Sequence, residues 1–284
     1  MRKTGIFYHY QQGERLRDFP RLLEGILDKP NVFLYDAIYP LKPRSDYDLE
    51  AAPSDLLSRV HTPRMLDQVA RSPYYETALY SAGGTVQAAE LIWRGEIDNA
   101  FVFTGVGDHH AGRDFFGGGC YLNGAALAIA HLRGSFGARR FAIVDTDAHH
   151  GDGTWDIFQD DPEVLYVCFC SGGNREHNNK LNVSIPGQTS DEEYLSRLEG
   201  EFGPRARAFC PQLIFWNWGY DNTRWEYGDM GLSPRCHEQM AERLQSVAEE
   251  VCQGRLLVVL CGGSGRDVAG YAIPGIIRRL ANLG

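Results

Sequence analysis

Apolar and polar positions alternate along the chain in a pattern typical of an α/β fold. Short apolar runs recur, and each is followed by a polar or glycine-containing loop and then by apolar residues at helical spacing. We interpret the apolar runs as buried strands at 5–8, 32–35, 100–104, 141–144, 164–169, 213–216 and 256–260, with an extended segment at 181–187. Because strands that alternate with helices form parallel sheets, we expect a central, mostly parallel sheet with helices on both faces.

The segments between these runs complete the predicted organisation. Helical spacing is present at 15–27, 81–93, 120–132, 190–202 and 232–252. Residues 52–69 predict helical turns interrupted by Pro63, and residues 38–48 and 171–180 predict loops. No repeat, low-complexity tract or long linker divides the chain, so we expect a single domain over residues 1–284.

Composition and charge narrow the class of protein. The net charge is −9 and the chain has no run of lysine and arginine, so nucleic acid is a poor candidate partner. No segment approaches the ~20 apolar residues of a membrane span, and the N-terminal apolar stretch is too brief for a secretory signal. We therefore expect a cytoplasmic protein that binds neither nucleic acid nor membrane, and the sequence is compatible with a homo-oligomer.

The cysteine pattern argues against disulfide bonds and against a zinc site built from thiolates. The seven cysteines are odd in number and include no CxxC pair. This usage disfavours both a disulfide framework and a thiolate zinc site. We expect most of these cysteines to be buried free thiols.

One strand-end segment, FAIVDTDAHHGDGTW, concentrates candidate chemistry. Its apolar run ends in Asp145, Asp147 and His149, which share one face of an extended chain. A carboxylate and an imidazole two residues apart suit a divalent metal. The alternative is a polar loop in which Asp152 or Thr154 caps the next helix. A cap needs one such residue, however, and the segment offers three acids and two histidines.

Three further polar loops follow predicted strands. GVGDHHAG carries His109 and His110, NWGYD carries Asp221, and CGGSGRD follows the last strand. The carboxyl ends of parallel strands meet at one edge, which is where open α/β sheets bind ligands. Asp147, His149 and Asp221 thus form a candidate ligand set that leaves a tetrahedral ion one position for water or substrate. The set suits Zn²⁺ and does not exclude Fe²⁺ or Mn²⁺.

The adjacent histidines supply the second half of the argument. A histidine beside an activated water takes its proton and passes it to a leaving amine when a carboxylate fixes the ring tautomer. Asp145 and Asp152 are available for that role beside His109 and His110. Alone, the dipeptide indicates helix capping or hydrogen bonding in a glycine loop about equally well. Its place beside the other strand-end loops favours catalysis.

Taken in order, these motifs resemble the zinc-dependent histone deacetylase and acetylpolyamine amidohydrolase superfamily, which has the arginase/deacetylase fold. The resemblance covers nearly the whole chain. It rests on GDHHAG at 107–112, GGGCYLNGAALAI at 117–129, VDTDAHHGDGT at 144–154, NVSIPG at 182–187, WGYD at 218–221 and LCGG at 260–263. It implies zinc-dependent hydrolysis of an acylated amine, such as an acyl-lysine, an acylpolyamine or a related small amide.

The resemblance also assigns roles by position. It makes Asp147, His149 and Asp221 the zinc ligands, in agreement with the interpretation from the residues themselves. It pairs His109 with Asp145, and it makes His110, together with Asp152, the general base and acid. It further implies structural K⁺ at two sites, the first at Asp145, Asp147, His149 and Cys168, and the second near Phe158, Asp161 and Val164.

Departures from the family pattern affect the expected substrate pocket. Ser264 stands where the family has a tyrosine that donates to the oxyanion, and loss of one such donor typically costs ~10²-fold or more in rate. Tyr271, Tyr227 and Tyr220 are candidate substitutes. Gly119, beside Gly118, stands where an aromatic wall is expected, which favours a wider acyl group or a different amide. Asp108 is expected to add a carboxylate near the pocket mouth, and Cys168 replaces a hydroxyl near the first K⁺ site.

Three functions follow from these features. The leading prediction is a zinc-dependent amidohydrolase with His110 as general base and acid. The second, prompted by Ser264, is a metal-containing acyl-lysine binding protein with little or no turnover. The third is an arginase-like ureohydrolase with two Mn²⁺ ions. It is disfavoured because such a site needs more bridging acids than the DTDAHHGD loop and Asp221 provide.

Overall fold

A single, mostly parallel sheet organises the computed structural model, which describes residues 2–9, 19–37 and 47–283. The strands in these residues follow the order β3-β2-β1-β4-β10-β9-β5-β6-β8-β7. Every pairing is parallel except that of β7 with β8. The predicted α/β class is confirmed.

The strands coincide closely with the predicted apolar runs. They are β1 (Thr4–His9), β2 (Val32–Ala37), β3 (Tyr47–Asp48), β4 (Asn99–Val102), β5 (Phe141–Asp145), β6 (Val164–Cys170), β7 (Arg175–His177), β8 (Lys180–Ser184), β9 (Leu213–Trp218) and β10 (Leu256–Leu260). The short edge strands β3 and β7 lie in segments predicted as loops. Residues 38–46 of the first of these segments lie outside the described residues.

Most of the predicted helices are present with shifted ends, and the helix at 266–280 was not predicted. They are α1 (Phe19–Leu22), α2 (Ser54–Leu57), α3 (Pro63–Ala70), α4 (Tyr75–Arg94), α5 (Gly124–Phe136), α6 (Asp152–Phe158), α7 (Asp191–Phe209), α8 (Pro234–Cys252) and α9 (Arg266–Leu280). Pro63 begins α3 instead of interrupting a helix, because its missing N–H costs nothing in the first turn. Part of the helix predicted at 15–27 lies outside the described residues.

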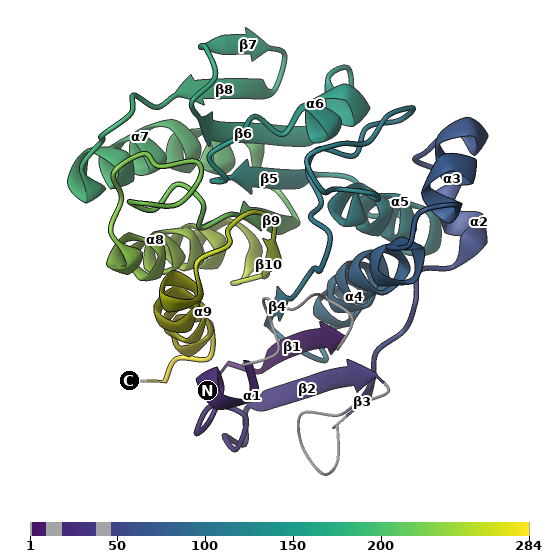
Figure 1. Ribbon diagram of the computed structural model, residues 1–284, viewed down its shortest axis with the longest axis horizontal. Coiled ribbons are helices and arrows are strands. Elements are labelled where there is room, and N and C mark those ends of the chain that lie inside the picture. Colours follow the sequence, from purple (N-terminus) through teal and green to yellow (C-terminus); the bar gives the residue numbers. More distant parts are fainter. Residues whose placement is uncertain (1, 10–18, 38–46, 284) are drawn as a thin grey trace.

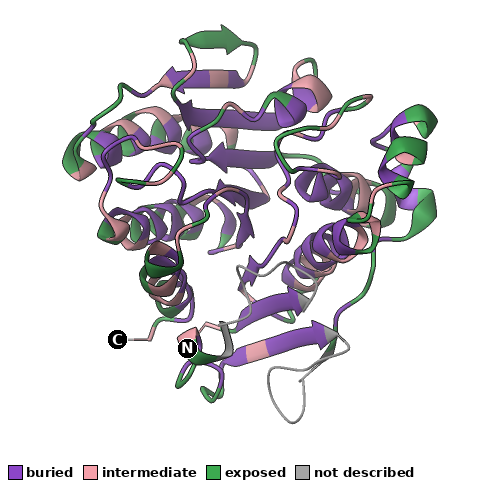
Figure 2. Ribbon diagram, in the orientation of Figure 1, coloured by how far each residue is buried: buried purple, intermediate pink, exposed green. Residues whose placement is uncertain are grey.

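Helices cover both faces of the sheet (Figure 1). The helices α4 and α5 pack on one face, and α7, α8 and α9 pack on the other. The central strands β5, β6, β9 and β10 are buried along their whole length (Figure 2). Burial on both faces explains why these strands are continuous apolar runs without alternation. No helix in the described ranges combines the length and apolarity needed to cross a bilayer.

Strand order brings the polar loops together. The strands β4, β10, β9 and β5 are consecutive neighbours in the sheet, although β4 and β10 are far apart in sequence. All four run in the same direction, so their carboxyl ends lie along one edge. The loops with the histidine pair, Asp221 and the Gly262–Gly263 turn therefore meet beside the loop that follows β5.

Candidate metal centre and active site

Two neighbouring strands bring the three predicted metal ligands together. Asp147 and His149 follow β5, and Asp221 follows β9, which pairs directly with β5. One ligand atom from each residue lies within 4.8 Å of the others. The Nδ1 atom of His149 lies 3.2 Å from Oδ1 of Asp147 and 2.8 Å from Oδ2 of Asp221. The set offers two carboxylates and one imidazole to a single centre.

The surroundings of the two carboxylates fit a bound cation. Asp147 and Asp221 are buried, and Oδ2 of Asp147 accepts no hydrogen bond from the described residues. A Cβ atom at Gly219 or Gly262 would collide with these carboxylates, so glycine backbone packs directly against them. Burial and repulsion from Asp147 raise the pKa of Asp221 to about 6. A divalent ion between the two carboxylates would remove that repulsion.

The third ligand carries a proton when no metal competes for it. Hydrogen bonds to Asp147 and Asp221 raise the pKa of His149 to about 10. A protonated imidazole therefore partly balances the two carboxylates in the metal-free chain. Since an imidazole that binds a metal must be neutral, a metal bound here would displace this proton.

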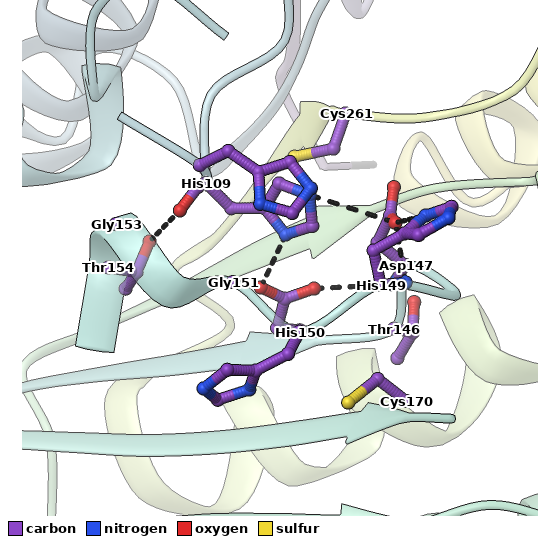
Figure 3. Close-up of polar contacts among 12 residues, drawn as sticks. His109, Thr146, Asp147, His149, His150, Gly151, Gly153, Thr154, Cys170 and Cys261 are labelled. Carbon is purple, nitrogen blue, oxygen red and sulfur yellow. Dashed lines mark hydrogen bonds and ion pairs between the residues drawn. The ribbon is translucent and has the colours of Figure 1, made fainter. Parts of the chain in front are cut away.

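The first histidine of the HisHis pair forms a buried contact with Asp145. Nδ1 of His109 lies 3.0 Å from Oδ2 of Asp145, and both side chains are almost inaccessible to solvent. The same Asp145 oxygen accepts a hydrogen bond from the Tyr166 hydroxyl at 2.9 Å. Burial lowers the pKa of His109, but the Asp145 and Asp147 carboxylates outweigh that effect and raise it to about 10. Figure 3 shows His109 pointing towards Asp147, with 3.7 Å between Nε2 and Oδ1.

The second histidine forms a similar contact nearer to solvent. Nδ1 of His110 lies 2.6 Å from Oδ1 of Asp152, the first residue of α6. Burial raises the pKa of Asp152, but the bond and charge of His110, the N–H of Gly153 and the charge of His109 together outweigh this and lower the pKa. A Cβ atom at Gly153 would collide with the backbone of His110 and Ala111, so the first turn of α6 rests directly on the histidine loop.

These groups face one cavity of about 700 Å³. Its lining includes Tyr74, Gly105, Val106, Gly107, His109, His110, Gly118, Gly119, Cys120, Tyr121, Asp147, His149, Tyr227, Cys261 and Gly262. Gly118 has a φ of 58°, and a Cβ there would collide with the His110 ring. A Cβ at Gly119 would meet nothing within 4 Å, so this wall of the cavity is open.

Ser264 is not among the residues that line this cavity. Its hydroxyl donates to Oε2 of Glu226 at 3.0 Å, and its backbone N–H donates to the same oxygen at 3.1 Å. The next N–H, of Gly265, donates to Oε1 of Glu226 at 2.7 Å. Glu226 thus holds Ser264 just before the start of α9, and the place of Ser264 in a substrate pocket stays a prediction.

Asp108 also differs from the expectation that it lies near the pocket mouth. Its side chain is buried, and its Oδ2 accepts hydrogen bonds from the N–H groups of Gly124 at 2.7 Å and Ala125 at 3.2 Å. These are unpaired donors in the first turn of α5, so the carboxylate caps that helix. Asp108 therefore has a structural position in this fold.

Strand β6 and the loop that follows β5 hold a second group of potential metal ligands. The sequence pattern did not indicate this group. His150, Cys168 and Cys170 each place a ligand atom within 4.8 Å of the others (Figure 3 shows His150 and Cys170). The signal was the C-x-C spacing, which puts both thiols on one face of a strand, whereas CxxC was the pattern considered. All seven cysteines are free thiols, as expected. Cys168 is also the strand partner of Asp145. The first K⁺ site stays a prediction.

Comparison with known proteins identifies the family. The histone deacetylase domain matches residues 53–280. The parallel sheet with a carboxylate–imidazole cluster at its carboxyl edge is that of an α/β protein with a candidate metal site. The family match makes the assignment specific. The chain belongs to the histone deacetylase family, so the resemblance noted from the motifs is confirmed.

Individual relatives support this assignment. A probable deacetylase of Archaeoglobus fulgidus is 34% identical over 226 residues, covering 74% of this chain and 62% of that protein. The histone deacetylase-like amidohydrolase of Pseudomonas aeruginosa is 29% identical, and the match covers 74% of this chain and 59% of that protein. Mouse polyamine deacetylase HDAC10 is 29% identical, covering 66% of this chain and 31% of that protein. The chain thus spans less than two thirds of these relatives.

A solved structure shows the same fold. The crystal structure of the HDA15 HD domain superposes with a TM-score of 0.82 at 22% sequence identity. The superposition covers 100% of this chain and 90% of that one. The arrangement of sheet and helices is therefore that of the deacetylase domain throughout the chain.

Proposed function

We propose that this protein is a zinc-dependent amidohydrolase that removes the acyl group from an acylated amine. The observation that carries the proposal is the cluster of Asp147, His149 and Asp221 at a cavity that Asp147 and His149 line together with His110. The His110 ring also contacts Asp152. Membership of the deacetylase family supports it, and we propose that the catalytic unit is a single domain. The ligand set favours Zn²⁺, with Fe²⁺ or Mn²⁺ as alternatives for the same position.

A zinc ion held by Asp147, His149 and Asp221 would polarise the substrate carbonyl and make water a better nucleophile. The chain's own residues supply the proton transfers. With its Nδ1–H donated to Asp152, His110 leaves Nε2 to accept a proton from the attacking water. Gly118 packs against the same ring, where a side chain would displace it. The proton then passes from Nε2 to the leaving nitrogen, which departs as the amine while the acyl group leaves as a carboxylic acid.

His109 has a different role in this proposal. Its ring is buried between the carboxylates of Asp145 and Asp147, which hold its positive charge. A cation fixed at this depth stabilises the negative charge that develops on the carbonyl oxygen nearby. His109 therefore acts through its charge, while His110 moves the proton.

The cavity suits an amine substrate with a broad acyl group. Its rim carries the aromatic side chains of Tyr74 and Tyr121, whose ring centroids lie 5.6 Å apart. Aromatic rings line sites that hold an aliphatic chain, and they also attract ammonium groups. The space beside Gly119 leaves room for an acyl group wider than acetyl. We propose acyl-lysine or acylpolyamine as the substrate class.

Metal analysis combined with an amide-hydrolysis screen tests the proposal. Protein reconstituted with Zn²⁺, Fe²⁺ or Mn²⁺ is incubated with lysine peptides and polyamines that carry acyl groups of increasing length, and amine release is measured. We expect multiple turnovers with at least one acyl group. Intact metal content with no amine release, for both the wild type and Ser264→Tyr, would overturn the proposal.

The position of Ser264 favours one alternative function, a metal-containing acyl-lysine binding protein. Ser264 is bound to Glu226 and does not reach the cavity, so it offers no donor to a developing oxyanion. Titration with acylated peptides and polyamines separates the two functions. Micromolar binding without product would support the binding protein, and multiple turnovers would exclude it.

A further inference from the structure

The proposed amidohydrolase reaction is faster when a hydrogen-bond donor faces the oxyanion that develops on the substrate. Three tyrosines are candidates now that Ser264 is accounted for. Tyr220 is buried and packs against Trp218, with ring centroids 5.5 Å apart. Tyr271 lines a separate cavity. Tyr227 lines the same cavity as His110 and two of the proposed metal ligands, Asp147 and His149.

Contacts place Tyr227 at the metal centre. Its ring stacks on the His149 imidazole, with centroids 5.7 Å apart and planes 26° from parallel. Its hydroxyl accepts a hydrogen bond from the N–H of Gly263 at 2.9 Å. The preceding residue, Gly262, packs against the carboxylates of Asp147 and Asp221 so closely that a Cβ would collide with them. The Tyr227 hydroxyl is therefore bound to the residue that follows Gly262, which itself contacts the two carboxylates.

We propose that Tyr227 donates the hydrogen bond that stabilises the substrate oxyanion. The inference rests on the proposed amidohydrolase function. A phenol keeps its proton at neutral pH and can donate it while accepting a second bond. The bond from Gly263 orients the hydroxyl and polarises it, which strengthens donation to the negatively charged oxygen. The donor thus comes from the loop after β9 instead of the turn after β10.

Replacement of a single oxygen atom tests this role. Tyr227→Phe keeps the ring on His149 and removes the hydroxyl. We expect kcat to fall by ~10²-fold or more, with metal content unchanged and KM within a few-fold of wild type. Tyr271→Phe is the matched control, because it removes the same atom outside this cavity, and we expect wild-type kcat.

A binding measurement separates this inference from the proposed function. A trifluoromethyl ketone analogue of an acylated amine binds as its hydrate, which resembles the tetrahedral intermediate. Tyr227→Phe is expected to bind it ~10²-fold more weakly than wild type. If wild type binds the ketone and the variant binds it weakly, Tyr227 keeps its role even when no acyl-amine is hydrolysed. Equal affinities, or no binding by wild type, would overturn the assignment.

A second, independent observation concerns Lys180, the first residue of β8. Its side chain is fully buried, which is rare for lysine unless the ammonium is paired. The Nζ atom donates to the backbone carbonyl of Asp161 at 2.7 Å. Asp161 lies in the loop between α6 and β6. Its carboxylate forms an ion pair with Arg133, with 2.5 Å between Nη1 and Oδ2. One carbonyl of this loop is therefore already bound to a fixed cation.

The same loop is where the family resemblance implies a second structural K⁺, near Phe158, Asp161 and Val164. The described contacts do not fit a free ion there. The Asp161 carbonyl binds the Lys180 ammonium, and the Phe158 carbonyl accepts the N–H of Asp161 at 2.9 Å. We infer that the Lys180 ammonium takes the place of the second potassium. An ammonium and a potassium ion carry the same charge, and both bind carbonyl oxygens.

Substitution combined with a change of salt tests this inference. Lys180→Ala removes the ammonium and leaves room for an ion, so we expect Tm to fall by roughly 4–10 °C in NaCl and to recover partly in KCl. Wild type and Lys29→Ala, a variant at an exposed lysine, set the background response to the two salts. An equal response to KCl in Lys180→Ala and wild type would overturn the inference.

A measurement on wild type covers the case in which Lys180→Ala fails to fold. Crystals of wild type are soaked in rubidium chloride, and the anomalous signal is measured. We expect no rubidium peak within bonding distance of the Asp161 carbonyl. A peak at that position would show that the loop holds an ion beside the lysine and would exclude the replacement.

Discussion

The two histidine–aspartate contacts of the site are built from the same residue types in different surroundings. His109 and Asp145 expose 3% and 0% of their side chains, whereas His110 and Asp152 expose 19% and 56%. Asp145 binds three groups, namely His109, Tyr166 and the N–H of Asp147. Asp152 stands at the start of α6 and binds His110 and its neighbour Gly153.

This difference in burial suits the two contacts to different roles, one that holds a fixed charge and one that transfers protons. A buried imidazolium between two carboxylates releases its proton with difficulty, because the pKa of His109 is raised to about 10. His110 is partly exposed and lines the cavity, so its ring is within reach of water and substrate. The inner contact therefore suits electrostatic stabilisation and the outer contact suits acid–base chemistry, so the variants below are expected to affect the two unequally.

The largest loss of metal and activity is expected on replacement of His149, the proposed metal ligand beside the two contacts. His149→Ala removes the imidazole from the cluster with Asp147 and Asp221, so two carboxylates remain and metal affinity collapses. We expect metal content near zero and activity at background, measured by elemental analysis and amine release. Retention of a full metal equivalent would show that His149 is not a ligand.

The outer contact should affect catalysis without affecting the metal. His110→Ala removes the proton carrier, and kcat is expected to fall by ~10²- to 10⁴-fold while metal content stays at the wild-type value. Asp152→Asn should lower kcat in the same direction, because the amide no longer orients the ring as a charged acceptor. Loss of metal in His110→Ala equal to that in His149→Ala would contradict the division of roles.

The inner contact should affect stability more than the outer one does. Asp145→Asn replaces a buried acceptor of three hydrogen bonds, and we expect the free energy of unfolding to fall by about 2–3 kcal/mol. Asp152→Asn lies at the surface and should change it by less than about 0.5 kcal/mol. Urea denaturation of the metal-free proteins measures both changes, and equal values would remove the distinction between the two contacts.

The smallest effect near neutral pH concerns a buried histidine outside the site, which sharpens the contrast with His109. His237 accepts a hydrogen bond from Trp218 Nε1 at 3.0 Å, and its Nε2 lies 2.7 Å from the Thr223 hydroxyl. Burial without a carboxylate partner lowers the pKa of His237 to about 3. The unfolded chain binds the proton first as pH falls below about 6.5, so His237 reduces stability increasingly between pH 6.5 and 3.

The slope of unfolding free energy against pH measures this contribution. We expect His237→Phe to take up about one proton fewer than wild type on unfolding near pH 5. The comparison is made in the metal-free protein, with urea midpoints taken at each pH. Identical slopes for the two proteins would show that His237 does not stay neutral in the folded state.

Most of the fold could be predicted because its strands are buried on both faces. Such strands are continuous apolar runs, and the polar residues that follow them mark the carboxyl edge of the sheet. That rule was enough to bring Asp147, His149 and Asp221 together from loops far apart in sequence. Helix α9 was not anticipated, because it contains Pro274 and several glycines, which usually mark loops.

The features that sequence could not provide depend on where long side chains point. The chain pattern does not reveal that Lys180 turns inwards to the Asp161 carbonyl, since lysine at the start of a strand is usually solvated. It also does not separate Tyr227 from Tyr220 and Tyr271, because the path of the loop after β9 decides which ring reaches the cavity. Asp108 was misplaced for the same reason, since helix capping depends on the position of α5.

The close packing of Gly153 against the histidine loop has a consequence for how the protein can lose activity. The first turn of α6 and the backbone of His110 and Ala111 touch with no room for a methyl group between them. The methyl group of an alanine at position 153 would force these two segments apart. It would push His110, the proposed general base, away from Asp152 although it carries no charge, binds no metal and meets no substrate. Substitutions that inactivate the proposed site therefore need not change any of its proposed reacting groups.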